Sequence, residues 1–162
     1  MPIHEEHATF PYSSEQLFDI VADVAAYPSF IPWCSGARIL SAGPTLIVAE
    51  LAIGFGPFSE SFTSHVDLSR PTEVVVRAIA GPLEHLTNRW RFAPSGSATR
   101  VDFFIDFQFK SHLLDHVANG MFHEAATRMM GAFEHRAHAV YRHKLQSAPA
   151  TKSSSGAAGR QD

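Results

Sequence analysis

Residues 111–145 form the longest helical pattern in the chain, and no proline interrupts it. Polar residues such as Glu124 and Arg128 occupy one side of this pattern, which is typical of an amphipathic helix with one dry face. Ser111 precedes the pattern and can cap its first turn through the hydroxyl group. A helix of about 50 Å needs a partner surface for its dry face. At about 100° per residue, that face comprises Leu114, Ala118, Met121, Phe122, Ala125, Met129, Ala132, Phe133 and Val140.

The residues before this helix follow a period of two, which is typical of strands with one buried face. Segments rich in Gly and Pro separate these runs and mark short turns. Because strands joined by short turns pair antiparallel, the chain is predicted to be α+β, with a curved antiparallel sheet covering the helix. The expected strands are 3–10, 37–40, 46–53, 58–68, 74–79, 85–92 and 101–109, and a short helix capped by Ser13 or Ser14 follows the first.

The segment 27–34 carries two prolines, Pro28 and Pro32, among four large apolar side chains. Proline lacks an amide hydrogen and disfavours helical geometry in the residue before it. We therefore expect neither a regular helix nor a central strand here. The large apolar side chains still need burial, so this segment is expected to pack against the core.

A chain of 162 residues with 45% hydrophobic and 18% charged residues can bury a core as a single domain. We expect this domain to span residues 1–146. The composition then changes to mainly Ala, Ser, Gly, Thr and Lys, so residues 147–162 are expected to form a disordered tail. The beginning of the chain shows no signal or transit pattern and no apolar run is long enough to span a membrane, which favours a cytoplasmic location.

Several classes of site are disfavoured by the residues present. The net charge of −3 argues against a partner held by phosphate neutralisation, so no nucleic acid is expected. His112 and His116 share a helix face, but no third metal ligand is placed by the sequence, so no metal site is expected. Neither a nucleophile elbow nor a phosphate-binding or dinucleotide loop occurs. Cys34 is the only cysteine, lacks an obvious partner base and is expected to be a small buried apolar residue.

Two polar residues fall on a sheet face that is otherwise apolar. By strand alternation, Glu60 shares a face with Phe62. In the same way, Asn88 shares a face with Trp90. A buried carboxylate or amide without a hydrogen bond is strongly unfavourable. Three interpretations stay open: the two residues pair within the sheet, they bind the polar head of a ligand, or Glu60 acts as a general base.

The dry face of the helix is compatible with two arrangements. In the commoner one, the helix packs on the sheet as part of a filled core. In the other, the helix leaves a gap for a ligand. Met121 and Met129 adapt to irregular shapes, and the alanines of this face leave room, so the second arrangement merits consideration.

Several motifs stand in order along the chain: 27–34, 52–55, 60–64, Gly81-Pro82, His85-Leu86, 88–92, 101–103, 107–109 and 132–134 with Arg136. Together they resemble the coenzyme Q-binding family of START-like proteins, within the wider polyketide cyclase and lipid-transport superfamily. The resemblance implies a helix-grip fold, in which a sheet of about six or seven strands wraps around a long C-terminal helix with an apolar tunnel between them. The chain departs from the family pattern at His123 and at Ala125-Ala126-Thr127.

This resemblance implies a non-catalytic protein that binds ubiquinone or a similar polyprenyl lipid and supports respiration or quinone biosynthesis. Beyond that bound quinone, no cofactor is implied. A transient contact with a membrane surface, and so a peripheral place at the inner membrane face, is a further expectation. The tunnel is then expected to be lined by Phe30, Trp33, Phe55, Phe58, Glu60, Phe62, Asn88, Trp90, Phe92, Phe103, Phe107, Met121, Phe122 and Met129.

Two alternatives come from the same superfamily. Some bacterial members are described as ribosome-association toxins, which makes the ribosome an alternative partner and translation control an alternative role. Other members of the superfamily are cyclases that act on small aromatic polyketides, and a fold alone does not decide between these roles. For an enzyme, Glu60 is the one candidate acid or base on the apolar face.

Overall fold

The structure, a computed structural model, describes residues 3–55 and 57–147, without the side chains of Phe55 and of residues 142–147. The predicted disordered tail therefore lies, from residue 148 onward, outside the described residues. The elements in chain order are β1 (Ile3–Phe10), α1 (Ser14–Ala22), the 3-10 turn η1 (Val24–Ala26), α2 (Tyr27–Phe30), β2 (Cys34–Ala42), β3 (Leu46–Phe55), β4 (Phe58–Ser69), β5 (Glu73–Ala80), β6 (Leu83–Ser95), β7 (Ala98–Phe109), α3 (His112–Thr127) and α4 (Met129–Ser147).

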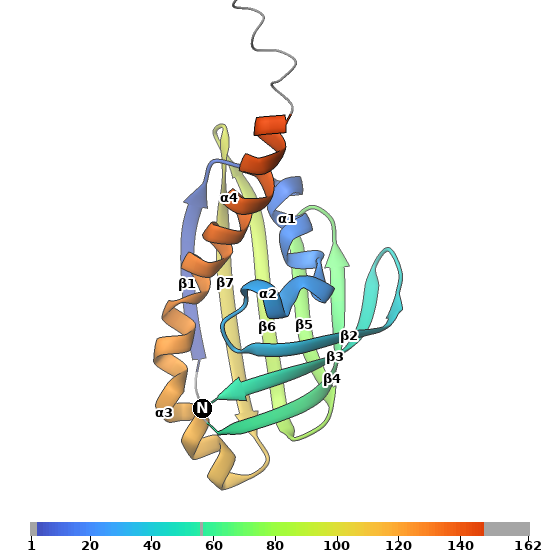
Figure 1. Ribbon diagram of the computed structural model, residues 1–162, viewed down its shortest axis with the longest axis vertical. Coiled ribbons are helices and arrows are strands. Elements are labelled where there is room, and N and C mark those ends of the chain that lie inside the picture. The colour runs from blue at the N-terminus through green and yellow to red at the C-terminus, as the bar shows by residue number, and fades with distance from the viewer. Residues whose placement is uncertain (1–2, 56, 148–162) are drawn as a thin grey trace, which may run out of the picture.

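All seven strands form one antiparallel sheet in the order β1-β7-β6-β5-β4-β3-β2. The helices cover one face of this sheet, and β2 and β3 run nearly across the direction of β6 and β7 because the sheet is strongly curved (Figure 1). The prediction of a curved antiparallel sheet that holds the C-terminal helical region is confirmed.

The covered face of the sheet carries most of the aromatic side chains of β6 and β7. Trp90 and Phe103 are register partners, and their ring centroids lie 4.8 Å apart in an edge arrangement. Phe133 of α4 packs against Trp90 at 5.0 Å and against Phe10 of β1 at 5.4 Å. Such aromatic pairs add about 0.5–1.5 kcal/mol each beyond simple burial. These rings therefore attach α4 to two separate strands.

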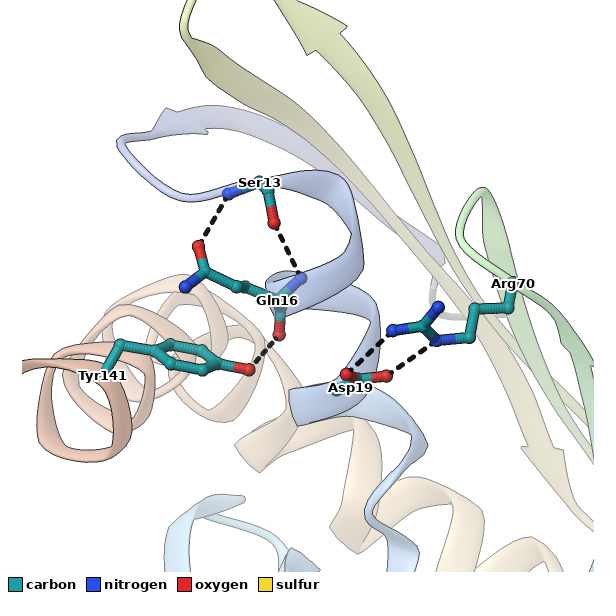
Figure 2. Close-up of polar contacts among 5 residues, drawn as sticks. All are labelled: Ser13, Gln16, Asp19, Arg70 and Tyr141. Atoms are coloured by element: carbon teal, nitrogen blue, oxygen red, sulfur yellow. Dashed lines mark hydrogen bonds and ion pairs between the residues drawn. The ribbon is translucent and has the colours of Figure 1, made fainter. Parts of the chain in front are cut away.

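Helix α1 is held at both ends by polar contacts (Figure 2). Ser13 Oγ accepts from Gln16 N at 3.1 Å and Gln16 Oε1 accepts from Ser13 N at 2.9 Å, so the predicted serine cap is confirmed as a full capping box. The Tyr141 hydroxyl of α4 donates to Gln16 O at 2.6 Å. Arg70 donates to both oxygens of Asp19 at 3.1 Å, but this exposed ion pair stabilises the fold little.

The hydroxyl of Tyr141 gives the fold a dependence on alkaline pH. Burial, followed by the charge of Asp19, raises the pKa of Tyr141 to about 12, whereas Arg70 acts in the opposite direction. An unfolded tyrosine titrates near pH 10, so the stability linked to the neutral phenol is complete below pH 10 and is lost as pH rises towards 12.

We therefore expect Tyr141→Phe to weaken this alkaline loss of stability. At pH 7 the variant should be less stable by about 1 kcal/mol, because the hydrogen bond to Gln16 O is lost. Between pH 10 and 12 its free energy of unfolding should fall less steeply than that of the wild type. Urea denaturation at a series of pH values measures both effects. Parallel pH profiles for the two proteins would contradict this account.

Helix α2 corrects the prediction that segment 27–34 contains no regular helix. Pro28 stands in the first turn of α2, where its missing amide hydrogen is not needed. The turn closes by a bond from Ile31 N to Tyr27 O at 2.8 Å. The expected packing of the segment on the core is confirmed, since Tyr27 and Ile31 are buried. The Tyr27 hydroxyl also donates to Val21 O at 2.6 Å.

The prediction of one unbroken helix over residues 111–145 is wrong at a single position. Arg128 separates α3 from α4, although the predicted Ser111 cap is confirmed by its acceptance from Leu114 N at 3.2 Å. Next to the break, Thr127 Oγ1 donates to the carbonyl of Glu124 at 2.9 Å. A threonine that bonds back to the preceding turn bends a helix. The break lets α3 and α4 follow different parts of the curved sheet.

The break also changes which helical side chains are buried. In α4 the buried residues continue from Met129 through Met130, Phe133 and Ala137, and they end at Tyr141. In α3 only two residues are buried, both of them alanines. Met121, predicted to lie on the dry face, is 40% exposed. Helix α3 is the less firmly packed of the two.

Gly81 and Gly120 differ in whether the backbone and its surroundings can accept a Cβ atom, so their alanine variants form a matched pair. Gly81 has φ of +130°, and a Cβ placed there would lie 2.9 Å from Phe62 Cβ. Gly81→Ala should therefore lower the free energy of unfolding by about 2 kcal/mol. Gly120 lies in α3 with no atom near an added Cβ. Gly120→Ala should raise stability by about 0.5–1 kcal/mol. Urea denaturation of both variants checks this pair, and equal effects would contradict it.

Candidate ligand-binding site

A cavity of about 190 Å³ lies between α3, the inner face of β6 and β7, and the segment that links α2 to β2. Its wall is mostly apolar, because every second side chain of β7 from Phe103 to Phe109 is apolar and faces the cavity. The lining residues are Pro32, Trp33, Ile53, Gly54, Leu86, Phe103, Ile105, Phe107, Phe109, Ala118, Met121, Phe122, Glu124, Ala125, Ala126, Arg128 and Met129.

Aromatic contacts fix the wall of this cavity on the side of β7. The Phe107 ring packs edge-on against Phe122 of α3 at 5.0 Å and against Phe109 at 5.9 Å. The ring of His4 on β1 packs against Phe103 at 6.1 Å and against Phe122 at 6.4 Å. These contacts connect α3 to the sheet along β1 and β7.

Alanines keep the cavity open on the side of α3. Ala118, Ala125 and Ala126 all face it, and a methyl side chain cannot reach the aromatic residues across the space. The cavity also reaches the surface, because exposed residues form part of its lining. Pro32, Met121, Glu124 and Arg128 are exposed, and all of them border the cavity.

Trp33 has an unusual position in the cavity wall. Its indole Nε1 is buried and, among the described residues, is the one buried side-chain nitrogen or oxygen without a hydrogen-bond partner. An unpaired buried donor costs about 1–3 kcal/mol. The other tryptophan is satisfied, because Trp90 Nε1 donates to Asn88 Oδ1 at 3.1 Å.

The residues expected from the sequence to line a tunnel fall into two groups. Those at the cavity are Trp33, Phe103, Phe107, Met121, Phe122 and Met129. Outside its lining lie Phe30, Phe58, Glu60, Phe62, Asn88, Trp90 and Phe92. Phe62, Trp90 and Phe92 are buried in the core instead. Phe55 falls outside the described side chains.

The two inward polar residues differ in their surroundings. Asn88 is buried, and its amide group is engaged on both sides, because Nδ2 donates to Phe104 O at 3.0 Å and Oδ1 accepts from Trp90. Asn88 therefore stabilises the sheet. Glu60 is half-buried opposite Ile53. Neither residue lines the cavity.

Three further expectations concern Cys34, metal binding and helices that could span a membrane. Cys34 is buried and its thiol donates to Gly36 O at 3.3 Å; burial raises the pKa of this thiol, so it stays protonated. No group of three or more potential metal ligands occurs within the described residues. None of the helices in this part of the chain has the length and apolar character needed to cross a bilayer.

Sequence patterns did not single out several cavity residues. Pro32, Ile53 and Gly54 share the cavity lining with residues of α3 because the sheet curves, and curvature is not visible in strand periodicity. Glu124 and Arg128 fall on the polar side of a straight helix and reach the cavity because the helix is broken. The cluster of alanines in α3 was the available signal, since small residues on a dry helix face leave space.

Comparisons with known proteins agree with this architecture. Residues 10–134 match a family model described as polyketide cyclase / dehydrase and lipid transport. The ribosome association toxin RatA of Escherichia coli K12 is 35% identical over 142 residues, covering 87% of this chain and 90% of that protein. The mitochondrial coenzyme Q-binding protein COQ10 homolog B of Xenopus laevis is 36% identical over 143 residues, covering 85% of this chain and 59% of that protein.

Solved structures give the same result. The solution structure of the 18 kDa protein CC1736 from Caulobacter crescentus is 37% identical, has a TM-score of 0.69 and matches 87% of this chain and 99% of that one. The Zhui aromatase/cyclase from Streptomyces shares the fold alone, with 18% identity, a TM-score of 0.72 and coverage of 84% and 93%. The model match and these identities show that the chain belongs to the polyketide cyclase / dehydrase and lipid transport family.

Proposed function

We propose that this protein binds a neutral polyprenyl quinone, such as ubiquinone, in the cavity under α3 without transforming it. The observation that carries this proposal is an apolar cavity that reaches the surface beside exposed residues of α3. Ligand sites of this kind are mostly apolar with a few polar groups that orient the ligand. The similarity to a relative named as a coenzyme Q-binding protein supports the choice of a quinone.

The charges at the cavity favour a neutral ligand. Glu124 and Arg128 are its two charged lining residues, one of each sign, and both are exposed. An anionic head group would require an excess of positive charge at this point. The same scarcity of titratable groups supports a binding role over an enzymatic one, because acid–base chemistry needs a positioned proton donor or acceptor.

The size of the cavity bears on how a long lipid is held. At about 190 Å³ it is smaller than the roughly 300–1,000 Å³ of pockets for drug-sized ligands. It therefore has room for a quinone ring and for only the first part of its tail. A longer tail requires α3 to move away from the sheet, which the sparse burial of α3 and the break at Arg128 favour. Exposed Leu113 and Met121 on α3 give the loading step an apolar contact with a membrane surface.

Two measurements test the proposal. Protein purified from its native host is extracted and analysed by mass spectrometry for co-purifying quinone. The stripped protein is then titrated with a short-chain ubiquinone while tryptophan fluorescence is followed. We expect an extractable quinone and saturable quenching. Protein that carries no quinone and shows no saturable quenching would contradict the proposal.

A second candidate function is the regulation of ribosomes. Its support is the similarity to relatives named ribosome association toxins, which include the Escherichia coli protein described above. Ribosome profiles on sucrose gradients, with and without added protein, separate the two proposals. Fewer assembled ribosomes and more free subunits would support this second function. Unchanged profiles would contradict it.

A further inference from the structure

We propose that the indole N–H of Trp33 is the hydrogen-bond donor that binds a carbonyl oxygen of the quinone ring. This inference rests on the proposed function and adds the position and orientation of the head group. It starts from the one buried side-chain donor that lacks a partner in the described part of the chain, in a residue that lines the cavity. Buried donors are normally satisfied, so this N–H needs an acceptor from outside the chain.

The surroundings of Trp33 leave the donor available. Its backbone carbonyl accepts from Gly54 N at 2.9 Å, which ties the segment after α2 to the end of β3 and fixes the base of the side chain. The indole ring is half-buried in the cavity wall. Because Nε1 itself is inaccessible in this arrangement, the indole ring has to rotate to bring it against an occupant of the cavity.

The chemistry of the site selects an acceptor. An indole N–H donates and cannot accept, so the group it binds must carry a free lone pair, as a quinone carbonyl does. Asn88, the polar residue expected from the sequence to do this, has both sides of its amide bonded within the protein. Trp33 follows the exposed Pro32 in the chain, and both line the cavity together with the exposed Arg128. The ring then lies near the mouth, and the isoprenoid tail extends inwards along Phe107 and Phe122.

The two tryptophans give a direct test with an internal control. In a ¹⁵N-labelled sample, the indole signal of Trp33 is assigned as the one absent from Trp33→Phe, and the other belongs to Trp90. We expect a ubiquinone with two isoprene units to move the Trp33 proton signal downfield in a saturable way. The Trp90 signal should move much less, because its N–H already donates to Asn88.

Affinity provides the second measurement. Trp33→Phe keeps an aromatic ring but removes the donor, so this quinone should bind about tenfold more weakly. N-phenyl-1-naphthylamine, an apolar dye without a carbonyl group, should bind wild type and variant within twofold of each other, which shows that the variant retains its cavity.

The outcomes distinguish this inference from the proposed function. If the quinone binds wild type but neither moves the Trp33 signal nor loses affinity in Trp33→Phe, the inference is overturned while the proposed function stands. If the quinone neither binds nor displaces the dye from wild type, the proposed function fails and this inference fails with it. A downfield shift of Trp33 together with weaker binding of the quinone alone supports both.

Discussion

Phe133→Ala is expected to lower the free energy of unfolding by about 3–5 kcal/mol. Only 1% of Phe133 is exposed, and its ring contacts Trp90 of β6 and Phe10 of β1. Truncation therefore removes two aromatic contacts and leaves a void between α4 and the sheet, where the surrounding strands cannot close in. Urea denaturation followed by far-ultraviolet circular dichroism measures the loss.

Phe104→Ala is the matched control for that experiment. Phe104 is a half-buried phenylalanine on β7, and the guanidinium group of Arg89 lies 4.7 Å from its ring centroid. Phe104 does not belong to the buried core. Its truncation should therefore lower the free energy of unfolding by about 1 kcal/mol or less. If both substitutions cost the same, α4 is not attached to the sheet through Phe133.

Ala125→Phe is expected to weaken quinone binding by about a hundredfold or more, with little loss of stability. Ala125 lines the cavity from α3, so a phenyl group there occupies the space of the ligand and contacts apolar residues that are already present. Filling a void with an apolar side chain is close to neutral for stability when the space is large enough. Displacement of N-phenyl-1-naphthylamine and urea denaturation measure the two effects separately.

The control is Ala139→Phe, which adds the same side chain at an exposed position of α4 outside the cavity lining. This variant should bind the quinone as the wild type does. Ala118→Leu, a smaller enlargement at another lining residue, should give an intermediate loss of affinity. Normal binding by Ala125→Phe would show that the ligand lies elsewhere.

The sequence predicted the fold well because its information is local and periodic. Strand alternation identified the meander, and the serine caps at Ser13 and Ser111 marked where helices begin. The break at Arg128 was missed because apolar spacing alone continues through it. The one-turn helix α2 is not visible in the sequence pattern, because two prolines in one segment disfavour a helix in general, whereas a proline in the first turn is tolerated.

The candidate site was predictable only in part, since alternation assigns a side chain to a face and not to a position along the cavity. Phe103 and Trp90 share a face and are register partners. Only Phe103 lines the cavity, because Phe133 of α4 covers Trp90. The unpaired N–H of Trp33 follows from the three-dimensional packing of α2 and β3, which no spacing in the sequence encodes.

Intermolecular nuclear Overhauser effects between the isoprenoid methyl groups of bound short-chain ubiquinone and the methionine methyl groups test the central claim most directly. Met129 and Met130 are adjacent and buried, but only Met129 lines the cavity. We predict contacts from the isoprenoid chain to Met129 and none to Met130. Saturable binding without contacts to Met129, or with contacts to Met130 instead, would contradict a ligand held between α3 and the sheet.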